Sequence, residues 1–240
     1  MNLSNLINAA SLALTVVFVM PLTVIIALLI TRRIRLLEFL KVTLVSVGCV
    51  VLSNALSYLG QHLSFLSEKI YIIIYELLVA AFCTLAFMLF SGYLRKHSDY
   101  GRMSSGFLFG MIKEWSYVAP VCFYDLVMFY RIQNGTIYDV LSADYSTAQI
   151  QEIVTTYSSM SAAVFFYYIF KAMVIILGYC ALVQFTAENE GIPVTASVFV
   201  FNLLTSLGNY TGMITAFVLL ILAAAIAAAA QLKPDMLSGK

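Results

Sequence analysis

Long, uninterrupted apolar runs restrict the fold of this chain more than any other feature of its sequence. Several of them reach roughly 20 residues, the length of helix that crosses a hydrocarbon layer of ~30 Å. Because the runs do not alternate between apolar and polar residues, they predict helices and not the strands of a membrane barrel. We therefore expect an all-α fold, a polytopic bundle of transmembrane helices that forms a single domain over residues 1–240.

The composition agrees with this fold class and excludes others. Hydrophobic residues make up 62% of the chain and charged residues only 10%, whereas a soluble domain carries about 25% charged residues because its surface faces water. The net charge of +1 provides no basic surface for a nucleic acid. We expect the outside of the bundle to contact the lipid bilayer.

About seven spans account for the order of apolar runs and polar breaks. The first five are expected at residues 6–30, 36–60, 70–94, 105–129 and 159–185. Residues 193–232 are too long for one span, and the turn-forming sequence GNYTG at residues 208–212 divides them into two.

The basic residues orient these spans, because cytoplasmic loops carry an excess of lysine and arginine. With the N-terminus outside, most basic residues of the loops and tail are cytoplasmic: Arg32, Arg33, Arg35, Arg95, Lys96, Arg102, Lys233 and Lys240. Lys69 and Arg131 are then outside, and the odd number of spans places the C-terminus in the cytoplasm. Short loops and dispersed cysteines favour a bacterial inner membrane, so we expect a multi-pass protein of the cell membrane.

Residues 133–158 form the sizeable extracytoplasmic segment of this topology. Their apolar side chains are spaced as in a short amphipathic helix that lies on the outer membrane surface. These side chains are Ile137, Val140, Leu141, Ile150, Ile153 and Val154. The alternative is a loop that only joins two spans.

Ionisable residues inside the predicted spans are the candidates for function, because burying a charge in a membrane costs a few kcal/mol. Glu114 and Asp125 are eleven residues apart and share one helix face, whereas Lys113 is expected to point elsewhere, toward the cytoplasmic interface. The candidate polar network comprises Glu76, Glu114, Asp125, Lys171, Tyr179 and Asn202. It either fixes how the spans pack, with Lys171 paired to a carboxylate, or forms a substrate path, an ion path or a catalytic site.

The residues that several familiar catalytic and phosphate-binding motifs require are missing from this sequence. The two histidines, His62 and His97, fall in predicted loops on opposite sides, and the chain has no HExxH, GxSxG or Walker A motif. The four cysteines form no CxxC pair and have no metal-ligand spacing, so we assign them to packing. We expect no metal and no cofactor.

The order of motifs along the middle spans points to one family. A basic loop leads into FLFG at residues 107–110 and then Glu114. The next span holds FKA at residues 170–172 and Tyr179, and a later span holds NLLTS at residues 202–206. Over about residues 95–210 this order resembles the YhfC-type and wider CAAX-protease-like intramembrane peptidases.

The resemblance implies a helical scaffold whose catalytic histidines are missing. In those peptidases a Glu activates water while His and Asn or Asp residues assist it. Here Tyr179 and Asn202 stand where the family has histidines. The resemblance therefore implies an inactive relative, a pseudo-peptidase that keeps a groove for a peptide or a membrane segment.

Three functions follow from this reasoning. The first is a non-catalytic membrane subunit that binds another membrane protein or an exported peptide. An alternative is a transporter for a small molecule or ion, or a substrate-binding membrane component. The third, which we rank last, is an active peptidase that uses Glu114.

Overall fold

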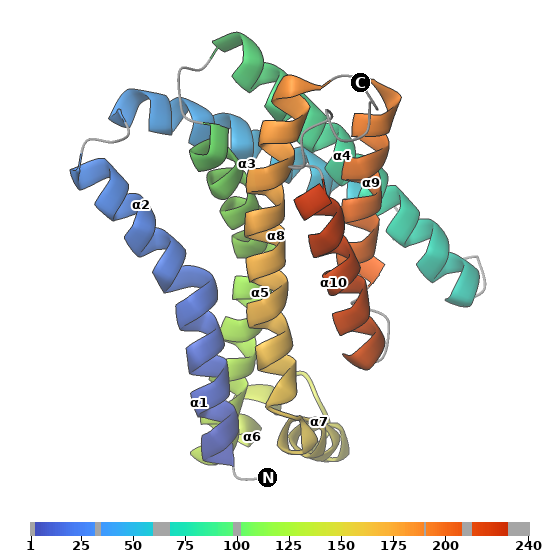
Figure 1. The fold of residues 1–240 in the computed structure, drawn as a ribbon. Coiled ribbons are helices and arrows are strands. Elements are labelled where there is room, and N and C mark those ends of the chain that lie inside the picture. The colour runs from blue at the N-terminus through green and yellow to red at the C-terminus, as the bar shows by residue number, and fades with distance from the viewer. Residues whose placement is uncertain are drawn as a thin grey trace. The chain divides into compact units, whose positions relative to one another are not determined.

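The computed structural model describes residues 3–31, 35–59, 68–97, 102–189, 191–207 and 213–229, and Figure 1 shows its fold. Within these residues every regular element is a helix, which confirms the all-α prediction. The turn at residues 208–212, His62 and some orienting residues lie outside the described part of the chain: Arg32, Arg33, Lys233 and Lys240.

Among the residues that the structure describes, four helical segments are long and apolar enough to cross a membrane. The first runs from Leu3 to Ile30 and consists of α1 (Leu3–Leu14), the π-helical turn η1 (Thr15–Val19) and α2 (Met20–Ile30). The others are within α3 (Leu36–Leu59), α4 (Glu68–His97) and α8 (Ala163–Glu188). Their length and composition are those of a membrane protein.

Three further helices coincide with the remaining predicted spans. The helix α5 (Arg102–Gln133) has 32 residues but carries Lys113, Glu114 and Asp125 within one span length. The helices α9 (Ile192–Leu207) and α10 (Met213–Ala229) are apolar and shorter, with 16 and 17 residues. The predicted division of residues 193–232 into two helices is confirmed.

The segment between α5 and α8 is helical, not a plain loop. It contains α6 (Ile137–Leu141) and α7 (Thr147–Ser159). Ser146 caps α7 in a capping box with Gln149, which satisfies backbone N–H groups at the helix start. Ile137 and Ile150 are buried with Met128 of α5, so an apolar face of this segment packs on the helix before it.

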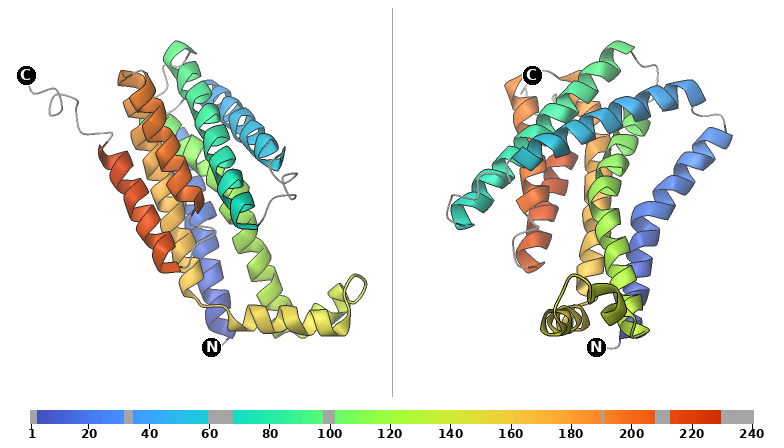
Figure 2. Two further views of the ribbon diagram at one scale, coloured as in Figure 1. Left: turned by 90° about the vertical axis from the view of Figure 1, so that its right-hand side faces the viewer. Right: turned by 180° about the vertical axis from the view of Figure 1, so that it is seen from behind.

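The chain divides into two compact units, and we describe each by itself. Unit 1 comprises Met1–Ile25 and Trp115–Ala172, and unit 2 comprises Ile26–Glu114 and Met173–Lys240. In unit 1, small residues of α1 such as Ala10 and Ala13 are fully buried with Cys122, Phe129 and Phe165 of α5 and α8. Within this unit, α7 lies crosswise to α1, α5 and α8 (Figure 2).

In unit 2, two glycines bring α5 against α8. A methyl group on Gly106 would lie 2.7 Å from Cys180 Cα, and one on Gly110 would lie 2.8 Å from Ile176 Cα. Gly106 and Gly110 are spaced as in GxxxG, the small-residue pattern that lets membrane helices approach closely. This close crossing sets α5 beside Tyr179 of α8.

Candidate functional site

A hydrogen-bonded pair, Tyr179 and Asn202, lies at the centre of unit 2. The Tyr179 hydroxyl donates to Asn202 Oδ1 at 2.5 Å, which joins α8 to α9. Tyr179 is fully buried and Asn202 is 1% exposed. The structure therefore brings together two of the residues that the sequence singled out.

Lys113 of α5 donates hydrogen bonds to both members of this pair. Its ammonium group donates to the Tyr179 hydroxyl at 2.7 Å and to Asn202 Oδ1 at 2.9 Å. The expectation that Lys113 points elsewhere, toward the interface, was wrong. The side chain of a helical residue leans toward the helix N-terminus, and here that direction leads to Tyr179.

Thr84 of α4 connects the same asparagine to a fourth helix. Asn202 Nδ2 donates to Thr84 Oγ1 at 3.2 Å and to the Val198 carbonyl at 3.0 Å. Thr84 in turn donates to the Ala80 carbonyl of its own helix at 2.7 Å. We call Lys113, Tyr179, Asn202 and Thr84 the polar centre; it links α4, α5, α8 and α9.

Aromatic rings pack around the Tyr179 side of the polar centre. The Tyr179 ring lies 5.0 Å from Phe87, 4.9 Å from Phe109 and 5.5 Å from Phe201, measured between ring centres. Hydrogen bonds among buried polar groups are stronger in such a low-dielectric environment, and an unsatisfied group is more costly. We therefore expect this network to hold one arrangement of the four helices.

A small cavity adjoins Lys113 and Tyr179. It offers about 10 Å³ to the centre of a water molecule and is also lined by Ser53 and Cys83. Ser53 Oγ and Cys83 Sγ are 3.1 Å apart. This volume is close to the lower limit for one buried water, so the cavity has no room for a substrate.

The other predicted site residues are buried, and the structure assigns them to different units. Glu114 is 1% exposed and Glu76 is 2% exposed, and both belong to unit 2. Asp125 and Lys171 belong to unit 1, where they are 6% and 3% exposed. That all six residues form one polar network stays a prediction.

In unit 1 the two buried charges contact tyrosines. Lys171 Nζ lies 4.9 Å from the centre of the Tyr117 ring. The Tyr157 hydroxyl of α7 donates to Asp125 Oδ1 at 3.4 Å. Burial and the neighbouring Asp125 carboxylate raise the pKa of Tyr157, so its hydroxyl keeps the proton that it donates. This bond ties the crosswise helix α7 to α5.

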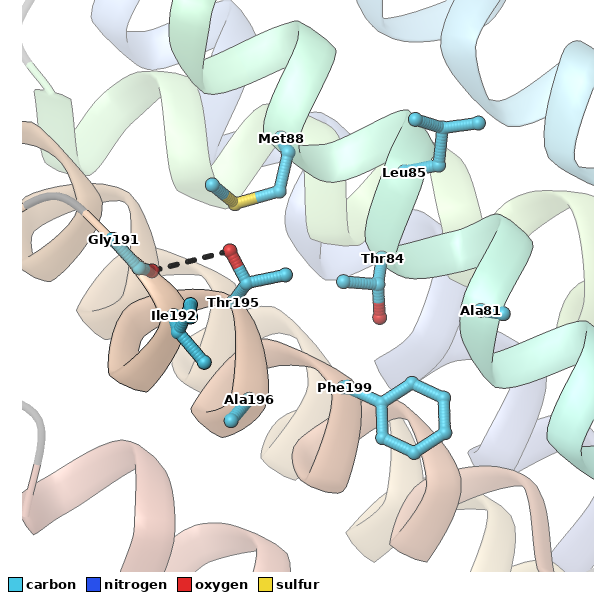
Figure 3. Close-up of a pocket in the computed structure, with 9 residues that line it drawn as sticks. All are labelled: Ala81, Thr84, Leu85, Met88, Gly191, Ile192, Thr195, Ala196 and Phe199. Atoms are coloured by element: carbon cyan, nitrogen blue, oxygen red, sulfur yellow. Dashed lines mark hydrogen bonds between the residues drawn. The ribbon is translucent and has the colours of Figure 1, made fainter.

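An open groove of about 750 Å³ runs between α4 and α9, next to the polar centre. Figure 3 shows Thr84 and Met88 of α4 and Thr195 of α9 pointing toward the space between the two helices. The lining is Ala81, Thr84, Leu85, Met88, Gly191, Ile192, Thr195, Ala196 and Phe199. None of these nine residues is charged, and Thr84 belongs to both the groove and the polar centre.

Sequence reasoning missed the groove and two members of the polar centre. Thr84 is an ordinary residue of an apolar run, and its role depends on which helix packs beside α4. Lys113 was recognised as an intramembrane charge, but its direction was misjudged. The GxxxG spacing of Gly106 and Gly110 was the signal that could have placed α5 close to another helix.

No known protein-family model matches this chain, and no curated protein or solved structure shows significant similarity to it. Fold and site together define a helical protein with segments of membrane-spanning length, a buried lysine–tyrosine–asparagine centre and an apolar groove beside it.

Proposed function

We propose that this chain is a non-catalytic membrane subunit that binds a membrane-spanning helix of another protein in the α4–α9 groove. The groove is the observation that carries this proposal. Its residues on α4 are 81, 84, 85 and 88, and those on α9 are 192, 195, 196 and 199. Each set has the i, i+3, i+4, i+7 spacing with which helices present a face to a partner helix.

The size of the lining side chains favours a helix as the occupant. Ala81 and Ala196 are small and exposed, and they lie between larger residues such as Leu85, Met88 and Phe199. Small residues flanked by larger ones let a neighbouring helix approach closely, which is the main source of helix association in lipid.

The hydroxyl groups of the groove argue against an extended peptide. Thr84 donates its proton to Ala80, and Thr195 donates its proton to the Gly191 carbonyl at 3.3 Å. An extended chain would bring backbone carbonyls that need donors, whereas a helix satisfies its own. Exported peptides therefore fit this groove less well than a transmembrane helix.

We further propose seven spans, with the N-terminus outside and the C-terminus in the cytoplasm of a bacterial cell. At 1.5 Å per residue, α9 and α10 are about 24 and 26 Å long, slightly short of a ~30 Å hydrocarbon core. Their apolar composition supports two short spans. On this topology α7 lies on the outer surface, and reporter fusions at residues 144 and 190 are expected to report opposite sides.

Photo-crosslinking in the native membrane tests the proposed function. A photoreactive amino acid at Ala196 is expected to capture one membrane protein, and the same group at Leu89, which is exposed on α4 outside the groove, is expected not to. Ala196→Trp should fill the groove and abolish co-purification of that protein. Ala225→Trp, at an exposed alanine of α10, is the matched control. Capture of lipid alone at Ala196 would contradict the proposal.

The buried charge of Lys171 favours one alternative, a transporter or a substrate-binding membrane component. Intramembrane charges such as Lys113 and Lys171 often mark substrate or ion paths. Under this alternative, Lys171→Met should abolish uptake while the protein still accumulates in the membrane. Unchanged uptake in that variant would remove Lys171 from such a path.

A further inference from the structure

The amide of Asn202 joins the polar centre to the groove. Its oxygen accepts from Lys113 and Tyr179, and its nitrogen donates to Thr84, which lines the groove. Asn202 is on α9 and Thr84 is on α4, so this one side chain bonds the two helices that form the groove.

Lys113 and the Val198 carbonyl together fix which way this amide points. An ammonium group can only donate, so the groups that face Lys113 must accept. Asn202 therefore presents its oxygen to Lys113 and its nitrogen to Thr84. Because the Tyr179 oxygen also accepts from Lys113, the tyrosine proton is directed to Asn202.

Without the charge the amide is held less firmly. Asn202 Oδ1 then keeps only the Tyr179 proton, while its nitrogen still donates to Thr84 and to the Val198 carbonyl. The Tyr179 oxygen loses its donor, so the tyrosine and the Asn202 amide can shift together and loosen the bond between α4 and α9.

We propose that Lys113 is the positioning residue of the α4–α9 groove: through Asn202 and Thr84 it fixes the spacing of the two lining helices. Lys113 itself does not line the groove. As far as partner binding is concerned, this inference rests on the proposed function. The spacing of α4 and α9 can be measured without any partner. The positioning role of Lys113 and the binding of a partner helix can therefore be disproved separately.

Electron paramagnetic resonance distances in lipid nanodiscs test the inference. Spin labels at Ala81 and Ala196 report the groove, and labels at Leu52 of α3 and Leu89 of α4 report a reference helix pair. Both pairs are placed in the full chain with its four native cysteines replaced by serine. We expect Lys113→Met to broaden the distance distribution of the groove pair only. Lys41→Met, which removes an exposed lysine from the same unit, should leave both pairs unchanged.

A milder variant keeps the test decisive if Lys113→Met does not fold. Thr84→Val removes only the oxygen at the groove end of the link, and it should broaden the groove pair as Lys113→Met does. Lys113→Arg keeps the charge and should restore the narrow distribution. An unchanged groove pair in Thr84→Val, or equal broadening of both pairs in Lys113→Met, overturns the inference.

The coupling of Lys113 to the groove should also affect how tightly the groove binds its partner helix. If the occupant needs the present spacing, Lys113→Met should weaken its binding roughly tenfold, the effect of about 1.4 kcal/mol of coupling. A groove pair that broadens without loss of partner binding would leave the positioning role standing and count against the groove as the partner site.

Discussion

The indole nitrogen of Trp115 donates a hydrogen bond to the carbonyl oxygen of Val17 at 3.1 Å, four residues before Pro21. In an α-helix the N–H of residue 21 would donate to this carbonyl, but proline has no N–H and its ring would collide with the carbonyl. The helix opens into a π turn over Thr15–Val19, and Trp115 supplies the missing donor. The Phe18 and Trp115 rings, with centres 4.5 Å apart, hold the indole in place.

Trp115→Phe should therefore destabilise the protein by about 1–3 kcal/mol, because a buried carbonyl loses its partner. Pro21→Ala restores an N–H at position 21, so Trp115→Phe should cost less in that background. Denaturation in mixed micelles, followed by circular dichroism, gives the four free energies of this double-mutant cycle. Additive effects would show that Pro21 and Trp115 are not linked through Val17.

At the α5–α8 crossing there is no room for a side chain at Gly106 or Gly110. Gly106→Ala and Gly110→Ala place a methyl group under 3 Å from the backbone of α8 and should each cost at least about 1–3 kcal/mol of overpacking. Gly48 and Gly92 have open space around them, so Gly48→Ala and Gly92→Ala should be neutral or gain up to about 1 kcal/mol of helix propensity. Thermal unfolding of the four variants compares them directly, and similar melting temperatures would argue against the close crossing.

Tyr179→Phe should weaken the polar centre without creating a large void. The variant leaves Lys113 and Asn202 each without one hydrogen-bond partner, which should cost about 1–3 kcal/mol. Tyr124→Phe, at a side chain that is 55% exposed, is the control and should change stability little. Equal free energies of unfolding for the two variants would mean that the hydroxyl of Tyr179 contributes no net stability.

Glu114→Gln distinguishes a subunit from an enzyme. In a non-catalytic subunit this substitution should leave co-purification of the partner intact and cost at most some stability. An active peptidase would lose its cleavage of membrane-embedded peptides completely. Both readouts are taken from the same membranes, with Glu38→Gln as a control at a partly exposed carboxylate.

The sequence determined the helical fold and the approximate limits of the long helices, because both follow from the length of apolar runs. The first predicted span ends at Ile30, as α2 does, and the second begins at Leu36, as α3 does. It also singled out Tyr179 and Asn202, since polar groups in an apolar run are conspicuous. For residues 133–158 the sequence left two alternatives open, an amphipathic helix and a loop. It could not choose between them because a short amphipathic pattern forms a stable helix only where it has a surface to pack on.

Only the tertiary structure decided which polar residues meet. The helical periodicity determines on which face of α5 Lys113 lies. The position of its ammonium group, at the end of a long side chain, depends on where a neighbouring helix offers hydrogen-bond acceptors. Whether Thr84 is an ordinary core residue or a link to Asn202 depends on the rotation of α4 against α9. Helix rotation and neighbour order arise from close packing, such as that at Gly106 and Gly110, and packing joins residues far apart in the chain. The polar centre and the groove result from that packing, whereas the apolar runs that form the helices around them can be recognised in the sequence alone.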